Sequence, residues 1–185
     1  MNSPGPRALR DEVLRKIGRN LVNFQKMEKA LKTIVSRSKM SGVVSEIELS
    51  QKKRDKAIEQ RTMGSLVKDF MGSVHSDVPL NTEEPDDLTE AWVSVSFRVG
   101  SDKEETRARK KALTLVVAER NTLVHKMLHT FDGSSEESCR KLITLLDEQH
   151  DRVAPHAKYV MQILAAMKAV QQEMANHLKT DEAAP

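Results

Sequence analysis

The sequence predicts an all-α fold: a four- or five-helix up-and-down bundle with a small two-stranded β-hairpin insertion. Long segments repeat apolar residues every three or four positions, as amphipathic helices do, while one short segment alternates apolar and polar residues. Aromatic residues make up only 3% of the chain and nine methionines are present, which predicts a core of aliphatic side chains and Met. A chain of 185 residues is long enough for a single domain with a substantial core.

The N-terminal half is predicted to hold two helices. The first spans about residues 8–40 and ends at Ser41-Gly42, because glycine favours helix ends. The second spans about residues 45–72; its first half is strongly charged, so we expect that half to project from the domain. The residues before position 8 are expected to form a flexible lead-in over 1–7.

A strand is predicted at residues 93–99, where four apolar residues alternate with Ser94, Ser96 and Arg98. Residues 74–80 alternate more loosely and are its expected partner, which places a hairpin insertion at about 74–99. An acidic loop lies between the two segments. A lone hairpin is marginally stable in water, so we expect it to pack on the bundle or on a second chain.

Three further helices are predicted after the strand. Ser101 with Glu104 forms a capping box that opens the first, which runs to Asp132-Gly133. A similar box at Ser134 opens the next, and Pro155 breaks or kinks it. The last helix runs to about residue 178. One helical domain is therefore expected over 8–179, with a flexible tail at 180–185.

Composition limits the classes of function. The single Cys139 excludes an intrachain disulfide and a multi-cysteine zinc site. The sequence has no long apolar segment for a membrane span and no apolar stretch typical of a signal peptide near its start, so we expect a cytoplasmic protein with no membrane partner. No cofactor-binding motif is visible.

The net charge of +3 is too small to indicate nucleic-acid binding by itself, but basic residues are clustered. One cluster comprises residues 52–54 and Lys56, and the other comprises Arg107, Arg109, Lys110 and Lys111. The simpler interpretation of both is a solvated helix face. The second cluster precedes a candidate catalytic motif on the same predicted helix, so it is the candidate site for RNA phosphates.

That motif is Arg120-Asn121-Thr122-Leu123-Val124-His125, inside an otherwise apolar, helix-periodic segment. An Arg followed by Asn and, five residues after the Arg, by His is expected roughly 0.01 times by chance in this composition. Arg19-Asn20 repeats the dipeptide without the His. Burying such polar groups without partners costs several kcal/mol, so their presence needs a reason.

Arg120, Asn121 and His125 are the candidate catalytic residues, because they supply what metal-free phosphodiester cleavage needs. An imidazole can take the proton from a ribose 2′-OH, and a guanidinium can hold the phosphorus oxygens. Residues four apart share a helix face, whereas residues five apart lie about 140° apart around the axis. A distortion of the helix would bring Arg120 closer to the other two. A symmetric dimer that pairs two copies of the helix is a second solution.

An all-helical domain with Arg-Asn-x-x-x-His late in its sequence resembles the HEPN superfamily, whose R-x(4–6)-H motif matches Arg120 and His125. Its favoured polar residue after the Arg matches Asn121. The resemblance implies an up-and-down bundle, a homodimer and, in active members, a metal-independent endoribonuclease, often a toxin paired with an antitoxin or a phage-defence protein. The branch regulated by adenylylation carries Tyr two residues after the His, where this chain has Met127.

Other interpretations remain open from the sequence. Some HEPN proteins are catalytically inactive, so the chain could be a dimeric module that binds RNA, a nucleotide or a protein. The motif could be a structural polar network within the bundle or the dimer. His125 and His129 stand four apart and could bind a metal, but no third ligand stands at a diagnostic distance, and no metal site is predicted.

Overall fold

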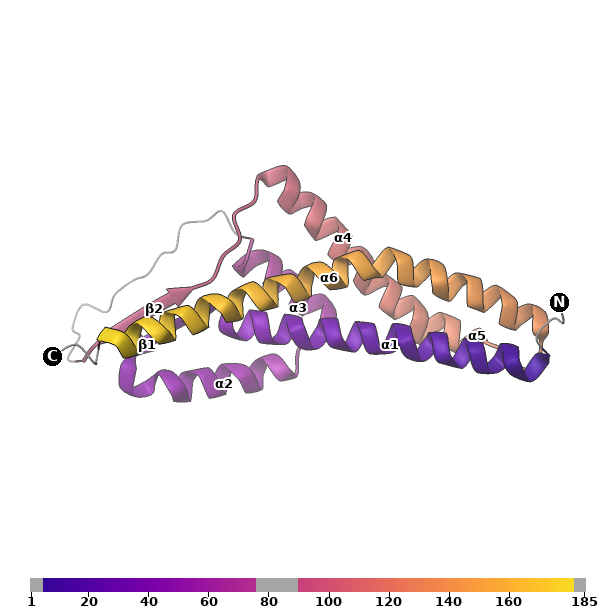
Figure 1. Cartoon of the computed structure of the whole chain (residues 1–185), viewed down its shortest axis with the longest axis horizontal. Helices are drawn as coiled ribbons and strands as arrows, with labels where there is room; N and C mark the ends of the chain where they lie inside the picture. The colour runs from indigo at the N-terminus through magenta and orange to yellow at the C-terminus, as the bar shows by residue number, and fades with distance from the viewer. Residues whose placement is uncertain (1–4, 76–89, 182–185) are drawn as a thin grey trace.

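The computed structural model describes residues 5–75 and 90–181, which form an all-α fold with a small antiparallel sheet (Figure 1). This confirms the predicted fold class. The elements, in chain order, are α1 (Pro6–Arg37), β1 (Lys39–Val43), η1 (Val44–Glu46), α2 (Ile47–Glu59), α3 (Met63–Ser73), β2 (Trp92–Ser96), α4 (Lys103–Thr122), η2 (Leu123–Met127), α5 (Leu128–Thr130) and α6 (Glu136–Asp181).

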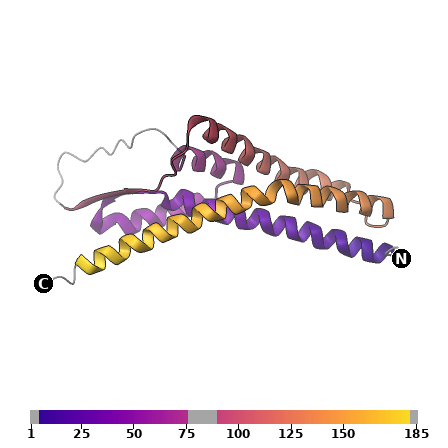
Figure 2. The ribbon, with the colours of Figure 1, turned by 45° about the horizontal axis from the view of Figure 1, so that its top comes forward.

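The long helices α1 and α6 run parallel and form the main pair of the bundle (Figures 1 and 2). Lys16 contacts Asp147 and Asn23 contacts His150, so residue numbers rise together along both helices. The helices between them alternate in direction. For example, α2 lies antiparallel to α1, because Lys32 donates to the carbonyl of Glu59 near the far end of α2. The chain therefore follows the predicted up-and-down order.

The core lies between α1, α3, α4 and α6. Fully buried side chains from these four helices include Leu31, Phe70, Leu113, Leu146 and Met167. Each contributes about 1.5–3 kcal/mol by leaving water. Cys139 is also buried, at 1% exposed.

The predicted second helix is interrupted. It divides into α2 and α3 at residues 60–62, where the Thr62 hydroxyl accepts the N–H of Ser65 and caps α3. The charged half, α2, does not project: Arg54 donates to the carbonyl of Val35 over 2.9 Å, which fastens α2 to the end of α1. The last carbonyls of a helix, including that of Val35, lack a backbone N–H partner within the helix. Polar side chains of α2 are therefore suited to this position.

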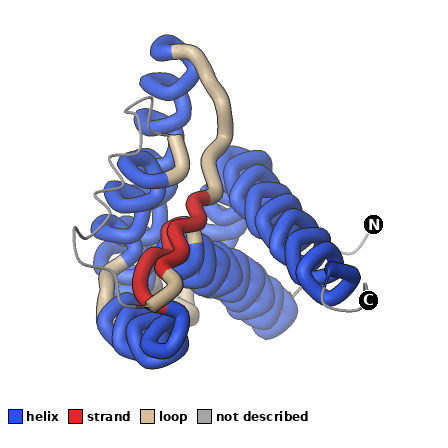
Figure 3. The backbone as a smooth tube through the Cα atoms, turned by 90° about the vertical axis from the view of Figure 1, so that its left-hand side faces the viewer, coloured by secondary structure: helices blue, strands red, loops and turns tan. Residues whose placement is uncertain are grey.

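The two-stranded sheet joins β1 and β2 in register from Lys39 opposite Ser96 to Val43 opposite Trp92 (Figure 3, red). The predicted strand near residue 93 is confirmed, and within the described residues its partner is β1 and not the segment that begins at Val74. Val74 caps the end of α3, residues 76–89 lie outside the described residues, and β1 is the segment that pairs with β2. Helix α1 ends at Arg37, which frees residues 39–43 to pair in an extended conformation.

Helix α6 is continuous through Pro155 and changes direction near the middle of its length (Figure 1). The predicted pair of helices is thus one helix of 46 residues. Pro155 lies on an exposed face, as does Asp151, whose carbonyl loses its helical donor at this proline; water can therefore replace the missing hydrogen bond. Across the described part of the chain, no helix has the length and apolar character needed to cross a membrane.

Candidate functional site

The six-residue motif lies where α4 passes into η2, a turn of π-helix. Arg120 occupies the last turn of α4, and His125 lies in the centre of η2. The N–H of Leu128 donates to the carbonyl of Leu123, five residues earlier, as in a π-helix. A π turn holds more residues than an α turn, so Arg120 and His125 are separated by less than the about 140° of an undistorted helix. The helix thus contains a distortion of the kind that was expected to bring Arg120 closer to Asn121 and His125.

The motif side chains lie on the outer surface of the bundle. Asn121 and His125 are exposed and Arg120 is partly exposed. Arg120 Nη1 donates to Asn121 Oδ1 over 3.2 Å. Among the described residues, this is the only hydrogen bond or ion pair that the three side chains make. Within residues 5–75 and 90–181 they are therefore not part of a larger polar network.

The first Arg-Asn dipeptide has the same local hydrogen bond but a different environment. Arg19 Nε donates to Asn20 Oδ1 over 3.0 Å. Asn20 is only 3% exposed, and its Nδ2 donates to the Leu146 carbonyl over 2.9 Å and to Gln149 Oε1 over 3.1 Å. Arg19 also contacts Asp147. The same dipeptide is thus a buried link between α1 and α6 at one position and a solvent-facing pair at the other.

Glu119, which directly precedes the motif, fixes α4 against α6. Its carboxylate accepts Arg152 Nε over 2.7 Å and Gln149 Nε2 over 3.1 Å, and its carbonyl accepts Gln149 Nε2 over 3.0 Å. Burial alone would raise the pKa of Glu119, but the hydrogen bonds from Arg152 and Gln149 outweigh it and lower the pKa. The sequence alone did not identify Glu119 as a positioning residue, because its partners lie about 30 residues away.

The predicted RNA-binding residues divide into two groups. Arg107, Lys110 and Lys111 are exposed along α4. Lys110 precedes Asn121 by three helical turns and shares its face, about 16 Å away along the axis. Arg109 is turned inward: its guanidinium carbon lies 3.6 Å from the centroid of the Tyr159 ring. Three of the four cations are therefore exposed, so far as the described residues show, on the outer face of α4, where a ligand could contact them.

Arg109 belongs to a polar cluster that the sequence did not reveal. His75, 4% exposed, accepts or donates on both ring nitrogens: Nε2 lies 2.7 Å from the Tyr159 hydroxyl and Nδ1 lies 3.4 Å from Ser101 Oγ. Burial and the charge of Arg109 lower the pKa of His75. Burial raises the pKa of Tyr159. The cluster joins the end of α3, the loop before α4 and α6, which indicates a packing role.

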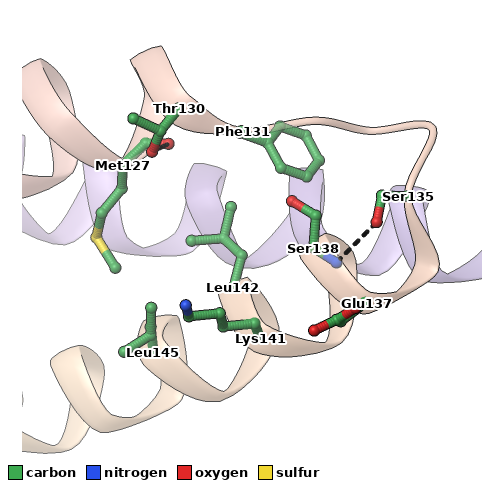
Figure 4. Close-up of a pocket in the computed structure, with 9 residues that line it drawn as sticks. All are labelled: Met127, Thr130, Phe131, Ser135, Glu137, Ser138, Lys141, Leu142 and Leu145. Carbon is green, nitrogen blue, oxygen red and sulfur yellow. Dashed lines mark hydrogen bonds between the residues drawn. The ribbon is translucent and has the colours of Figure 1, made fainter.

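A hollow of about 400 Å³ lies just beyond the motif, between η2, α5 and the start of α6 (Figure 4). Met127, Phe131, Leu142 and Leu145 form its apolar wall, and Lys141 adds a cation. The N–H of Ser138 donates to Ser135 Oγ at its edge, over 3.2 Å, which caps α6. The hollow is large enough for a planar ring, and it begins two residues after His125.

Within the described residues, no group of three or more His, Cys, Asp or Glu side chains could hold a metal ion. His125 and His129 are both exposed, and among the described residues no third metal-ligating side chain joins them. No protein-family model matches the sequence, and no curated protein and no solved structure is significantly similar to it.

Proposed function

We propose that the chain is a metal-independent endoribonuclease that cleaves RNA by attack of a ribose 2′-OH on the adjacent phosphorus. The products are a 2′,3′-cyclic phosphate and a 5′-OH end. The observation that carries this proposal is the contrast between the two Arg-Asn dipeptides. Arg19-Asn20 is buried in a network, whereas Arg120-Asn121 and His125 face solvent with polar atoms available to a ligand.

Each residue has a role that its chemistry supports. Neutral His125 accepts the proton of the 2′-OH. Arg120 donates N–H groups to the non-bridging phosphorus oxygens, where negative charge grows in the transition state. Asn121 accepts a hydrogen bond from Arg120 and thereby orients the guanidinium. Because 2′-OH is the nucleophile, DNA is not a substrate.

The basic residues of α4 support RNA as the ligand. Arg107, Lys110 and Lys111 extend the cationic character of the exposed helix face away from the motif. Phosphates flanking the cut site would lie along this face, and the binding they provide carries no sequence information by itself. Affinity should therefore fall as salt is added.

We also propose that the active form is a homodimer of the HEPN type, in the cytoplasm, in which two motif helices meet across a two-fold axis. Such an arrangement would collect two copies of each motif residue in one cleft. The resemblance to HEPN toxins and phage-defence proteins supports a role that a protein partner, such as an antitoxin, restrains.

The test is to incubate the purified chain with a defined RNA in EDTA and to analyse the products. The proposal expects fragments ending in a 2′,3′-cyclic phosphate, and a single 2′-deoxy substitution at the mapped cut site should block cleavage there. If the RNA stays intact but is bound, the chain is a catalytically inactive RNA-binding module. If cleavage requires added manganese, the metal-independent mechanism is wrong.

A further inference from the structure

His129 lies one helical turn after His125, and both imidazoles are exposed. We infer that His129 is the general acid of the reaction, which protonates the leaving 5′-oxygen while His125 removes the 2′ proton. This inference rests on the proposed ribonuclease function. It supplies from the same chain the second proton-transfer group, the general acid, which one copy of the six-residue motif lacks.

The positions of the two histidines suit the reaction. Residues four apart share a face in an α-helix, with Cβ atoms about 5–6 Å apart, and they remain on one face where the helix widens into the π turn that holds His125. In a displacement at phosphorus, the attacking and leaving oxygens stand on opposite sides of the phosphorus atom, so the base and the acid must also flank it. Two imidazoles one turn apart can reach these two oxygens with the phosphate between them.

The helix between the histidines is well fixed. The π turn holding His125 closes through the Leu128 N–H, and Leu123, at its start, is fully buried. After it, the Thr130 hydroxyl donates to the Lys126 carbonyl over 3.0 Å, within the turn that carries His129. Exposure of both rings lets them exchange protons with water after each reaction.

The 2′-oxygen loses its proton to neutral His125 and forms a bond to phosphorus, and the bond between phosphorus and the 5′-oxygen breaks. Protonated His129 gives its proton to that 5′-oxygen, which leaves as an alcohol. His125 ends protonated and His129 ends neutral, and exchange with solvent restores both.

The experiment compares two RNA substrates of one sequence, one with the natural 5′-oxygen at the cut site and one with a 5′-sulfur there. A thiolate leaves without protonation, so a missing general acid matters only for the oxygen substrate. His129→Ala and His129→Gln should cleave the oxygen substrate about 100- to 10,000-fold more slowly than wild type. Both should cleave the sulfur substrate within a few fold of wild type.

Two comparisons make the result decisive. His125→Ala should be slow on both substrates, because the 2′ proton must be removed in either case. His177→Ala, on an exposed face of α6 with a side chain 75% exposed, should match wild type on both. The melting temperature of each variant is measured as well, to establish that the variant is folded.

The inference is overturned if the His129 variants match wild type on the oxygen substrate, or if they are equally slow on both substrates. Failure of the proposed function looks different. In that case the wild-type chain leaves both substrates intact, or His125→Ala cleaves as fast as wild type.

Discussion

Asn20 on α1 donates its side-chain amide to the side-chain carbonyl of Gln149 on α6, 3.1 Å away, and both side chains are buried. Gln149 in turn donates to the backbone and the carboxylate of Glu119 on α4. One chain of hydrogen bonds thus connects three helices and ends at the residue before Arg120. The position of the motif helix depends on this buried contact.

Asn20→Ala should lower the free energy of unfolding by about 1–3 kcal/mol, because it leaves Gln149 Oε1 and the Leu146 carbonyl without this donor. The matched substitution Asn121→Ala removes an exposed side chain and should change the free energy by about 0.5 kcal/mol or less. Urea unfolding followed by circular dichroism measures both. Equal losses in the two variants would show that the second dipeptide is also structural.

Stability should fall as the pH drops from about 6.5, partly because of His75. Burial and Arg109 lower its pKa in the folded chain, although Glu105 opposes this, so the unfolded chain binds the proton more readily. The stabilisation is present above the unfolded pKa of about 6.5 and is lost toward the lower folded pKa. Thermal unfolding between pH 8 and 5 should show a shallower decline for His75→Gln than for wild type.

His156 acts in the same direction, because burial and Arg109 lower its pKa as well. Stability should therefore still depend on pH in His75→Gln, and this dependence should be weaker again in the double variant His75→Gln with His156→Gln. Tyr159, whose hydroxyl contacts His75, does not titrate in this range. A decline as steep in the double variant as in wild type would assign the effect to other groups.

Arg120→Ala and His125→Ala should each slow RNA cleavage by about 100- to 10,000-fold while leaving the melting temperature nearly unchanged, since neither side chain contributes to the buried network. Arg120→Lys should restore little activity, because an ammonium lacks the planar fork that binds two oxygens. Single-turnover rates with excess protein separate this loss from weaker RNA binding. Variants that melt far below wild type would instead indicate a structural role.

Sedimentation equilibrium at micromolar concentration should give a mass of twice 20.8 kDa. The proposed interface contains the exposed face of α4. Thr114→Arg on this face should therefore shift the equilibrium toward the monomer, and RNA cleavage should fall in parallel. A matched Thr144→Arg substitution on the exposed side of α6 serves as the control. Exclusive recovery of a 20.8 kDa species at these concentrations would contradict the dimer.

The sequence predicted where helices lie because their apolar periodicity is local, but it did not predict the interruption between α2 and α3 or the continuity of α6. The segment at β2 was also recognisable from its alternation, but its partner was not, since β1 lies some 50 residues earlier and follows α1 directly. Pro155 was predicted to break or kink the helix; α6 changes direction near its middle but does not break, because the proline lies on an exposed face where water can take the place of the missing donor.

The candidate site was predicted from residue types alone, but its geometry was not. Nothing in residues 123–127 distinguishes a π turn from an α-helix, because the same apolar periodicity fits both, and only the hydrogen bond from Leu128 to Leu123 separates them. Arg109 shows the same limit. It belongs to a basic cluster in the sequence, yet its guanidinium packs against the ring of Tyr159, 50 residues later in the chain.

The parallel pairing of α1 with α6 has a consequence for the newly made chain. Lys16 and Asp147 are 131 residues apart, so α1 leaves the ribosome long before its main partner is synthesised. At about 5–20 residues per second, translation leaves the apolar face of α1 without α6 for roughly ten seconds. During that interval α2 and α3 are the segments available to shield it, and chaperones that bind exposed apolar helices would compete for the same face.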